Sequence, residues 1–135
     1  MSRTSFVSKL RDQVIRPLIQ SALVEQEISE VTVAVVVGTE FYNSLQDPEE
    51  RWTYPEDGHE YVWAYVTYLP TNERSGWRLG RSEDLHDPIE LVNALWQLGS
   101  DFEDWVCETT FAWGEERHAR VPKVRDLPEW LTAGA

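Results

Sequence analysis

The stretch that decides the fold is EVTVAVVVG, residues 30–38. Most of its side chains are β-branched, and such side chains fit the pleated surface of a β-strand. Both faces of the predicted strand are apolar, because valine or alanine occupies almost every position. Strands in the middle of a sheet covered on both faces show this pattern. The stretch therefore predicts a central strand.

A second stretch, EYVWAYVTYL at residues 60–69, predicts the neighbouring strand. Alternate side chains of a strand point to opposite faces of its sheet. One face then carries Val62, Ala64, Val66 and Tyr68, and the other carries Tyr61, Trp63, Tyr65 and Thr67. Residues 77–81 predict a short third strand. If helices cover only one face of this sheet, the sequence does not show what covers the aromatic side chains on the other.

Two helices are predicted. Residues 4–23 carry apolar side chains at helical spacing, but Pro17 implies a kink or two short helices, because proline lacks an N–H. Asp87 and Pro88 form a typical helix start, with Asp at the N-cap and Pro at the first helical position. We expect this second helix to end near Gly99. Its expected buried residues are Leu91, Val92, Leu95, Trp96 and Leu98.

The C-terminal third of the chain predicts a β-hairpin. Residues 105–113 predict one strand, and residues 117–124 predict the strand that returns after a turn. Pro122 cannot donate a ladder hydrogen bond, so the returning strand is expected at the edge of the sheet. Together the elements predict a single α+β domain over residues 1–135. It would have a mostly antiparallel sheet of four to five strands, with two helices packed on one face.

The charge distribution points to a class of partner. The chain has 24 Asp and Glu against 12 Lys and Arg, a net charge of −12. Residues 82–116 hold ten acids and no Lys or Arg, and residues 40–60 hold seven acids with Arg51 as their one base. Such a field repels nucleic acid and membrane phosphates and attracts basic proteins. We expect a basic protein surface as the partner, with no nucleic acid and no membrane.

The cysteine count and the absence of long apolar runs bear on location. Cys107 is the only cysteine, so no intramolecular disulfide is possible, and a lone cysteine is typical of a reducing compartment. No apolar run is long enough for a signal peptide or a membrane span. These features predict a cytoplasmic protein.

The sequence offers little that supports catalysis. No histidine has a second His or Cys at metal-ligand spacing, and Asp57 with His59 is the nearest approach to a ligand pair. Cys107 would need a nearby histidine to act as a nucleophile, and a small buried cysteine in a strand is the commoner case. No glycine-rich phosphate loop is present. We expect a protein that is not an enzyme and uses no metal and no cofactor.

Tryptophan and acidic residues predict the binding surface. Trp52 and Trp77 lie in polar sequence beside acids or arginines, and an exposed tryptophan is a typical binding anchor. Carboxylates around an aromatic ring suit a basic partner, because the ring supplies contact area and the acids steer the encounter. The residues expected to bind the partner are Asp47, Glu49, Glu50, Trp52, Glu56, Asp57, Asp101, Glu103 and Asp104.

A basic cluster stands apart from the acidic stretches. Its members are Arg117, His118, Arg120, Lys123 and Arg125. The cluster lies on the predicted returning strand, where basic side chains protect an edge against pairing with other sheets. A phosphate-binding patch is the alternative, but the charge of the rest of the chain opposes it. We favour edge protection.

The order of these elements resembles the YezG-like family of immunity proteins, which are antitoxins. The stretches that carry the resemblance are LRDQVIRPLIQSAL, EVTVAVVVG, EYVWAYVTYL, PIELVNALWQL and DFEDWVCETTFAWGEERHARV. The loop at 39–58 and the proline-rich end depart from the family's pattern. The resemblance implies a small cytoplasmic protein that binds and neutralises a cognate toxin, often a nuclease.

Two other classes of function are open at this point. One is a non-enzymatic adaptor or chaperone-like module that binds another basic protein. The other is a small enzyme that uses Asp57, His59 or Cys107. A toxin-like gene beside this one would favour an immunity protein, whereas a bound metal or a deep pocket holding two of these residues would favour an enzyme.

Overall fold

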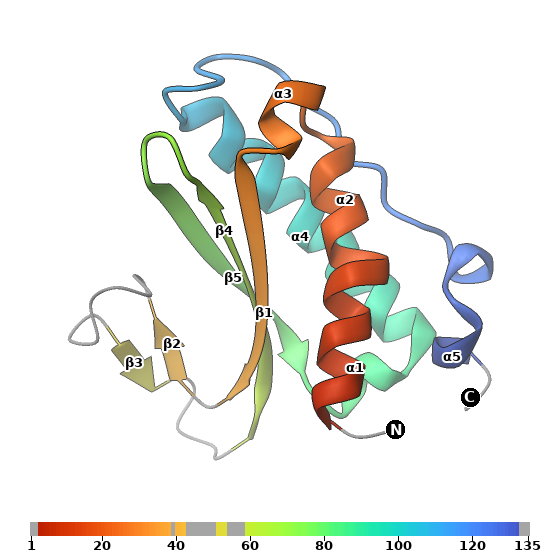
Figure 1. The fold of residues 1–135 in the computed structure, drawn as a ribbon. Helices are drawn as coiled ribbons and strands as arrows, with labels where there is room; N and C mark the ends of the chain where they lie inside the picture. Colours follow the sequence, from red (N-terminus) through yellow and green to blue (C-terminus); the bar gives the residue numbers. More distant parts are fainter. Residues whose placement is uncertain (1–2, 39, 43–50, 54–58, 133–135) are drawn as a thin grey trace.

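The computed structural model describes residues 3–38, 40–42, 51–53 and 59–132. Strands β1, β4 and β5 form a three-stranded antiparallel sheet with helices packed on one face, and β2 pairs with β3 in a separate two-stranded sheet (Figure 1). The α+β class is confirmed. The expected sheet of four to five strands is wrong for the described residues, because their main sheet has three. The strands are β1 (Val31–Gly38), β2 (Glu40–Tyr42), β3 (Arg51–Thr53), β4 (Tyr61–Tyr68) and β5 (Glu73–Arg81).

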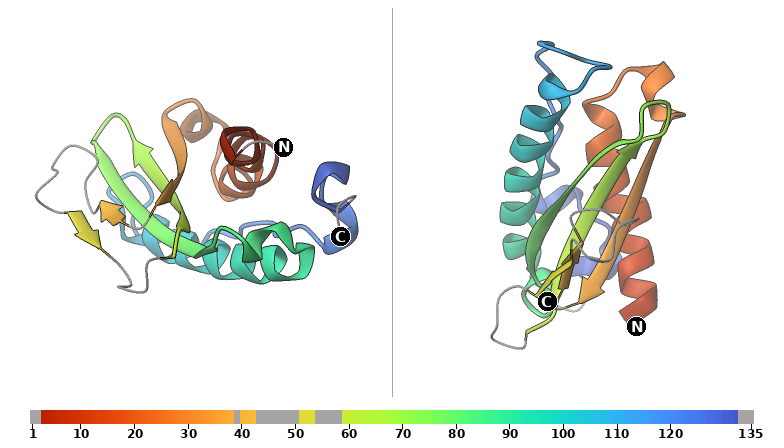
Figure 2. Two further views of the ribbon diagram at one scale, coloured as in Figure 1. Left: turned by 90° about the horizontal axis from the view of Figure 1, so that it is seen from below. Right: turned by 90° about the vertical axis from the view of Figure 1, so that its left-hand side faces the viewer.

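The helical elements of the described residues differ widely in length, and α4 is much the longest. They are α1 (Arg3–Leu10), the π-helical turn η1 (Arg11–Ile15), α2 (Arg16–Ser21), α3 (Glu25–Ile28), the 3-10 turn η3 (Asp84–His86), α4 (Pro88–Glu108), the 3-10 turn η4 (Val124–Asp126) and α5 (Glu129–Thr132). Figure 2 shows α1 and α2 in the layer behind β1, and α4 in the layer behind β5.

β4 lies in the middle of the sheet, with β1 and β5 at the two edges. The prediction that β1 is central is therefore wrong within the described residues. β1 pairs with β4 over all eight of its residues in unbroken register. Its two apolar faces have separate partners, because Val33 and Val35 join the main core while Ala34 packs beside the aromatic residues of β4. Apolar faces alone do not distinguish an edge strand from a central one.

The two faces of the sheet contact two different clusters. The inner face packs with α1, α2 and α4 in the main core. The outer face holds Tyr61, Trp63 and Tyr65, all buried, as the predicted alternation requires. Trp63 Nε1 donates to the Gly38 carbonyl at 3.2 Å, and the Arg78 guanidinium lies 4.8 Å from the centre of the Tyr61 ring. The aromatic face is thus buried and not a bare surface.

The first helix region continues through Pro17 without a break. A five-residue π-helical turn precedes α2, and Pro17 lies in the first turn of α2. Proline in a helix removes one N–H and its ring crowds the preceding turn. In a π-helical turn the backbone pairs over five residues instead of four. This wider turn lies before Pro17 and makes room for its ring. The expected kink or division is therefore replaced by a change of helix type.

The long helix α4 begins where the sequence predicts and ends later. Asp87 caps it, because its Oδ1 accepts hydrogen bonds from the Ile89 amide at 2.9 Å and the Glu90 amide at 3.5 Å. The predicted end at Gly99 is wrong, and so is the predicted strand at 105–113, because the helix runs on through Glu108. The buried residues along this helix continue at helical spacing. They are Leu91, Leu95, Leu98, Phe102 and Val106.

Gly99 lies inside α4 because another segment crosses it closely. A Cβ at this position would lie 3.4 Å from the side chains of Ala119 and Val121. The Ala119 amide donates to Glu103 Oε2 at 2.7 Å, and the Arg120 amide on the same segment donates to a serine of α2 at 2.8 Å. The segment after α4 is thus held between α2 and α4.

The predicted returning strand at 117–124 is wrong, because the described residues there pair with no strand. The edge position inferred from Pro122 is wrong for the same reason. The basic cluster therefore does not protect a sheet edge. Its first member, Arg117, has a structural role of another kind.

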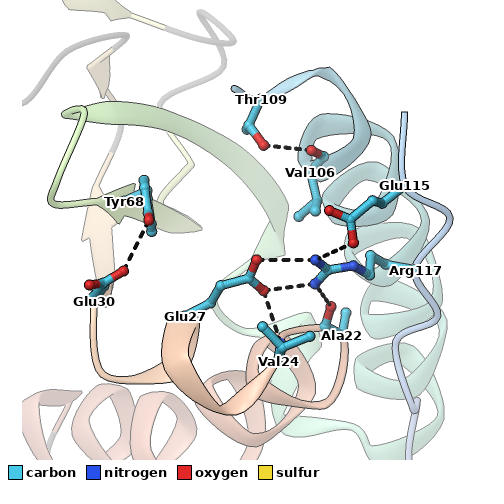
Figure 3. Close-up of polar contacts among 9 residues, drawn as sticks. All are labelled: Ala22, Val24, Glu27, Glu30, Tyr68, Val106, Thr109, Glu115 and Arg117. Carbon is cyan, nitrogen blue, oxygen red and sulfur yellow. Dashed lines mark hydrogen bonds and ion pairs between the residues drawn. The ribbon is translucent and has the colours of Figure 1, made fainter. Parts of the chain in front are cut away.

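Arg117 joins three parts of the chain (Figure 3). Its guanidinium donates to both carboxylate oxygens of Glu27 on α3, at 2.7 and 3.1 Å, to the Ala22 carbonyl at 3.0 Å, and to Glu115 at 2.9 Å. Burial alone would raise the pKa of Glu27, but hydrogen bonds from Arg117 and from the Val24 amide outweigh it and lower that pKa. The hydrogen bond to Glu27 raises the pKa of Arg117. The pair fixes the C-terminal segment against the turn that precedes β1.

Candidate functional site on the outer face of helix α4

The predicted binding residues of the first acidic stretch fall mostly outside the described part of the chain. The residues outside it are Asp47, Glu49, Glu50, Glu56 and Asp57. Trp52 lies on β3, where its backbone is paired opposite Phe41. The prediction that Trp52 anchors a partner stays a prediction.

The predicted binding residues of the second acidic stretch lie on α4 and not on a loop. Glu103 is tied to the C-terminal segment through the Ala119 amide. Asp101 Oδ1 accepts from Gln97 Nε2 at 2.9 Å, one helical turn earlier. Asp104 is exposed. Asp101 and Asp104 therefore remain candidates for a partner surface, whereas Glu103 has an internal role.

The exposed side of α4 carries two large apolar side chains. Ile89 is 64% exposed and Trp96 is 62% exposed. They are seven residues apart, which is two helical turns, so they lie on one stripe about 10 Å apart along the axis. The prediction that Trp96 is buried is wrong. The stripe of buried residues follows Leu95, and Trp96 lies one position, about 100°, further round the helix.

Acidic and amide side chains surround this apolar pair. We define the α4 outer face as Ile89, Glu90, Asn93, Trp96, Gln97, Ser100, Asp101, Asp104 and Glu108. All of these are exposed except Asp101, which is half-buried. The face has four carboxylates and no base, and it lies in the stretch 82–116 that has no Lys or Arg. An exposed tryptophan with acids around it is thus present, although not in the loop where it was expected.

Two further tryptophans contrast with each other, because Trp77 is half-buried and Trp113 is exposed. Trp77, a predicted anchor, packs on the core between Phe102 and Trp105, with ring centres 6.1 and 6.0 Å away. That prediction is wrong, because Trp77 lies on the inner face of β5. Trp113 is 75% exposed in the turn that follows α4. The stretch without bases therefore presents two exposed tryptophans, Trp96 and Trp113.

Of the residues considered for catalysis, Asp57 lies outside the described residues, and His59 and Cys107 are not brought together. His59 lines an open cleft with Glu60, Ser82, Glu83 and His86. Its Nδ1 lies 3.9 Å from Glu83 Oε1. Among the described residues, no group of three or more His, Cys, Asp or Glu side chains is placed to hold a metal ion.

Cys107 is on α4, so the prediction that it lies in a strand is wrong. Its Sγ is half-buried and donates to the Asp104 carbonyl at 3.1 Å, one turn earlier in the helix. A cysteine bonded in this way to its own helix is a local structural contact. The cleft around His59 does not include it.

The sequence contained a signal that would have located the α4 outer face. The apolar spacing of four and three residues continues from Leu95 and Leu98 to Phe102 and Val106. This spacing extends the helix past Gly99 and places Trp96 outside the buried stripe. Glycine at a helix end is common, and here that expectation outweighed the periodicity.

No family model matches the chain, and the comparisons with curated proteins and with solved structures find no match. None of the helices among the described residues has both the length and the apolar character of a membrane span.

Proposed function

We propose that this protein binds a basic surface of another protein through the α4 outer face. The observation that supports this most directly is Trp96, whose ring is 62% exposed on a helix side that carries acids and no base. In keeping with the resemblance to immunity proteins, the proposed partner is a toxin domain in the cytoplasm, for instance a nuclease. Binding would neutralise the toxin by covering its basic cleft.

Trp96 and Ile89 supply the apolar contact area in this proposal. Each leaves well over half of its side chain in water, and a partner that covers both removes that area from solvent. Tryptophan is enriched among residues whose truncation costs about 2 kcal/mol or more of binding free energy. Ile89 lies on the same stripe and completes a small apolar centre with a polar rim, the pattern of specific interfaces.

The carboxylates supply steering and partner choice. Glu90, Asp101, Asp104 and Glu108 present negative charge around the apolar centre. A basic cleft that binds phosphates is complementary to this face. Steering of this kind raises association rates by about one to three orders of magnitude and weakens as salt increases. An acidic face therefore suits an inhibitor that must reach a toxin quickly.

The test needs a candidate partner, which would be the product of any toxin-like gene found beside this one. Cells that co-express the two proteins are scored for survival, and the purified proteins are titrated against each other. Trp96→Ala is expected to weaken binding at least about 30-fold, the equivalent of about 2 kcal/mol. Its thermal melting should match the wild type, because the ring is largely in solvent.

Two matched controls accompany this variant. Trp113→Ala removes a tryptophan that is even more exposed but lies outside the α4 outer face, so it should bind normally. Asp101→Asn with Asp104→Asn should slow association, whereas Glu25→Gln with Glu116→Gln makes the same charge change at exposed residues elsewhere and should slow it less. Normal binding by Trp96→Ala, or loss of binding by Trp113→Ala alone, would reject the α4 outer face as the interface.

A further inference from the structure

Among the described residues, β4 is the one strand that pairs with β1, so the other edge of β1 faces away from the sheet. The Leu69 amide donates to the Glu30 carbonyl at 2.9 Å, and hydrogen-bonded pairs in antiparallel strands recur at every second residue. The register between β1 and β4 has no bulge, so the even-numbered residues of β1 are the ones bonded to β4. The backbone groups that point away from β4 belong to Val31, Val33, Val35 and Val37.

This edge lacks the features that normally prevent strand pairing. Native sheets protect their edges with lysine or other charges, proline, bulges or very short strands. β1 has eight residues, VTVAVVVG, with no charge, no proline and no bulge. Val36, on the outer face, is 37% exposed, and Thr32 on the same face is also exposed. Figure 2 (right) shows this strand along one side of the sheet.

We infer that β1 pairs antiparallel with β1 of a second copy of this chain, which makes one continuous six-stranded sheet. Two identical strands related by a two-fold axis are self-complementary, because each outward N–H meets an outward C=O. This inference does not rest on the proposed function of the α4 outer face.

Charge limits where two copies of this chain can meet. Each chain has a net charge of −12, so two copies repel each other through most of their acidic surface. Residues 31–38 contain no charged side chain, and they offer a stretch where two acidic molecules can meet without opposing carboxylates. The acidic α4 outer face, by contrast, suits a partner of opposite charge.

One register uses all four outward-facing residues. In it, Val31 lies opposite Val37 of the second copy, and Val33 lies opposite Val35 of the second copy. The two-fold axis then passes beside Ala34, which faces Ala34 of the second copy as a non-hydrogen-bonded pair with Cα atoms about 4.5 Å apart. That separation lies within the range that a disulfide can bridge.

A cross-linking experiment tests this register. The variant Ala34→Cys in a Cys107→Ser background is expected to form a disulfide-linked dimer under mild oxidation. Val36→Cys in the same background is the control, because in this register two copies of that position are four residues apart, about 13 Å. Equal cross-linking of both variants, or none in Ala34→Cys, would overturn the proposed register.

Solution measurements test the pairing itself. Sedimentation of the wild-type protein is expected to show a dimer that dissociates on dilution. Val36→Lys places a charge on the edge and should shift the dissociation to at least tenfold higher concentration. Val124→Lys is the matched control, since Val124 is also 37% exposed but lies outside the sheet, and it should leave the dimer intact. A wild-type protein that is monomeric at every concentration, or a fully dimeric Val36→Lys, would overturn the inference.

Amide hydrogen exchange gives a residue-level check if Val36→Lys folds poorly. The amides of Val33 and Val35 should exchange slowly in concentrated wild-type protein and faster on dilution. The amides of Ala34 and Val36 bond within the sheet, so their exchange should depend much less on concentration. Exchange at Val33 and Val35 that is fast at all concentrations would overturn the pairing. Added salt should strengthen the dimer by screening repulsion, whereas it should weaken the complex with a basic partner.

Discussion

The two edges of the main sheet are built very differently. β5 carries Arg74, Arg78 and Arg81, is interrupted by a bulge opposite Val62 and Trp63, and contacts α4 through Trp77. β1 has no charge, no bulge and no proline. Charges and bulges are the means by which native sheets avoid pairing with other strands. The β5 edge is therefore protected against pairing with another strand, whereas the β1 edge of the described sheet is not.

The difference also divides the surface of the molecule into two kinds of contact. Beneath the β5 half of the sheet, α4 turns a strongly acidic face to solvent, with Trp96 at its centre. At the β1 edge the chain is uncharged and rich in valine. The acidic face of α4 suits a different protein with a basic surface. The β1 edge suits the same strand of a second copy. Variants near each edge can therefore separate what stabilises the sheet from what lets it pair.

The largest loss of stability should come from removing a core side chain of α4 that packs beneath β5. Phe102 is fully buried, and its ring lies 6.1 Å from Trp77, edge to face. Phe102→Ala leaves a cavity and should lower the free energy of unfolding by about 3 to 5 kcal/mol. Urea denaturation measures this, with Trp96→Ala on the opposite side of α4 as the control, expected within about 0.5 kcal/mol of wild type. Equal losses in both variants would contradict the assignment of the two sides of the helix.

A smaller loss should follow from releasing the turn before β1. Glu27→Gln leaves Arg117 with Glu115 as its remaining carboxylate partner and should cost about 2 kcal/mol at pH 7. The pKa of Glu27 is lowered in the folded state from its value of 4.5. Its contribution is therefore complete above that pH and is lost as the pH falls through the folded-state pKa.

The pH dependence provides the control for this prediction. The stability difference between wild type and Glu27→Gln should shrink in acid below pH 4.5. Thermal melts from neutral to acidic pH measure it. A difference that stays constant across this range would show that the ion pair with Arg117 is not its source.

A still smaller loss of stability should come from a substitution that strains the backbone of β5. Gly80 in β5 has φ +155°, and a Cβ there would meet Leu85 at an ordinary contact distance of 3.5 Å. Gly80→Ala should cost about 1 kcal/mol, because the backbone and not the contact is strained. Gly114, with φ +74° and open space around it, is the comparison, and its alanine variant should cost a similar amount. Unchanged unfolding curves for Gly80→Ala would contradict this conformation of β5.

The smallest effect should come from adding charge to β1. Thr32 is exposed on the outer face, so Thr32→Lys should change the stability of the monomer by no more than about 0.5 kcal/mol. If this variant is as stable as wild type yet dimerises less, the uncharged edge of β1 serves association and not folding. Denaturation at low protein concentration measures the monomer. A large loss of monomer stability in Thr32→Lys would show that β1 must be uncharged in order to fold.

The strands and the start of α4 were predictable because their signals are local. The alternation in 60–69 predicted the two faces of β4, and the aromatic face proved to be buried. The capping pattern at Asp87 and Pro88 predicted the first turn of α4, which depends on bonds between residues two and three positions apart. Short-range chemistry of this kind is present in the sequence itself.

Contacts between distant segments decided the rest. Gly99 is typical of a helix end, yet the helix continues because Ala119 and Val121 cross there and Phe102 extends the buried stripe. The aromatic and β-branched residues of 105–113 fit a strand equally well until packing against Trp77 selects the helix. Local preference is weak compared with burial in a core.

The sequence by itself determined the α+β class, the faces of β4, the start of α4 and the acidic stretch without bases. Those properties follow from periodicity, capping and charge, which are set residue by residue. Tertiary structure alone decided that β1 is an edge strand, that α4 continues through Glu108, and that Trp96 faces solvent while Trp77 does not. Each of these depends on which distant residues come into contact, because burial is a property of the packed chain.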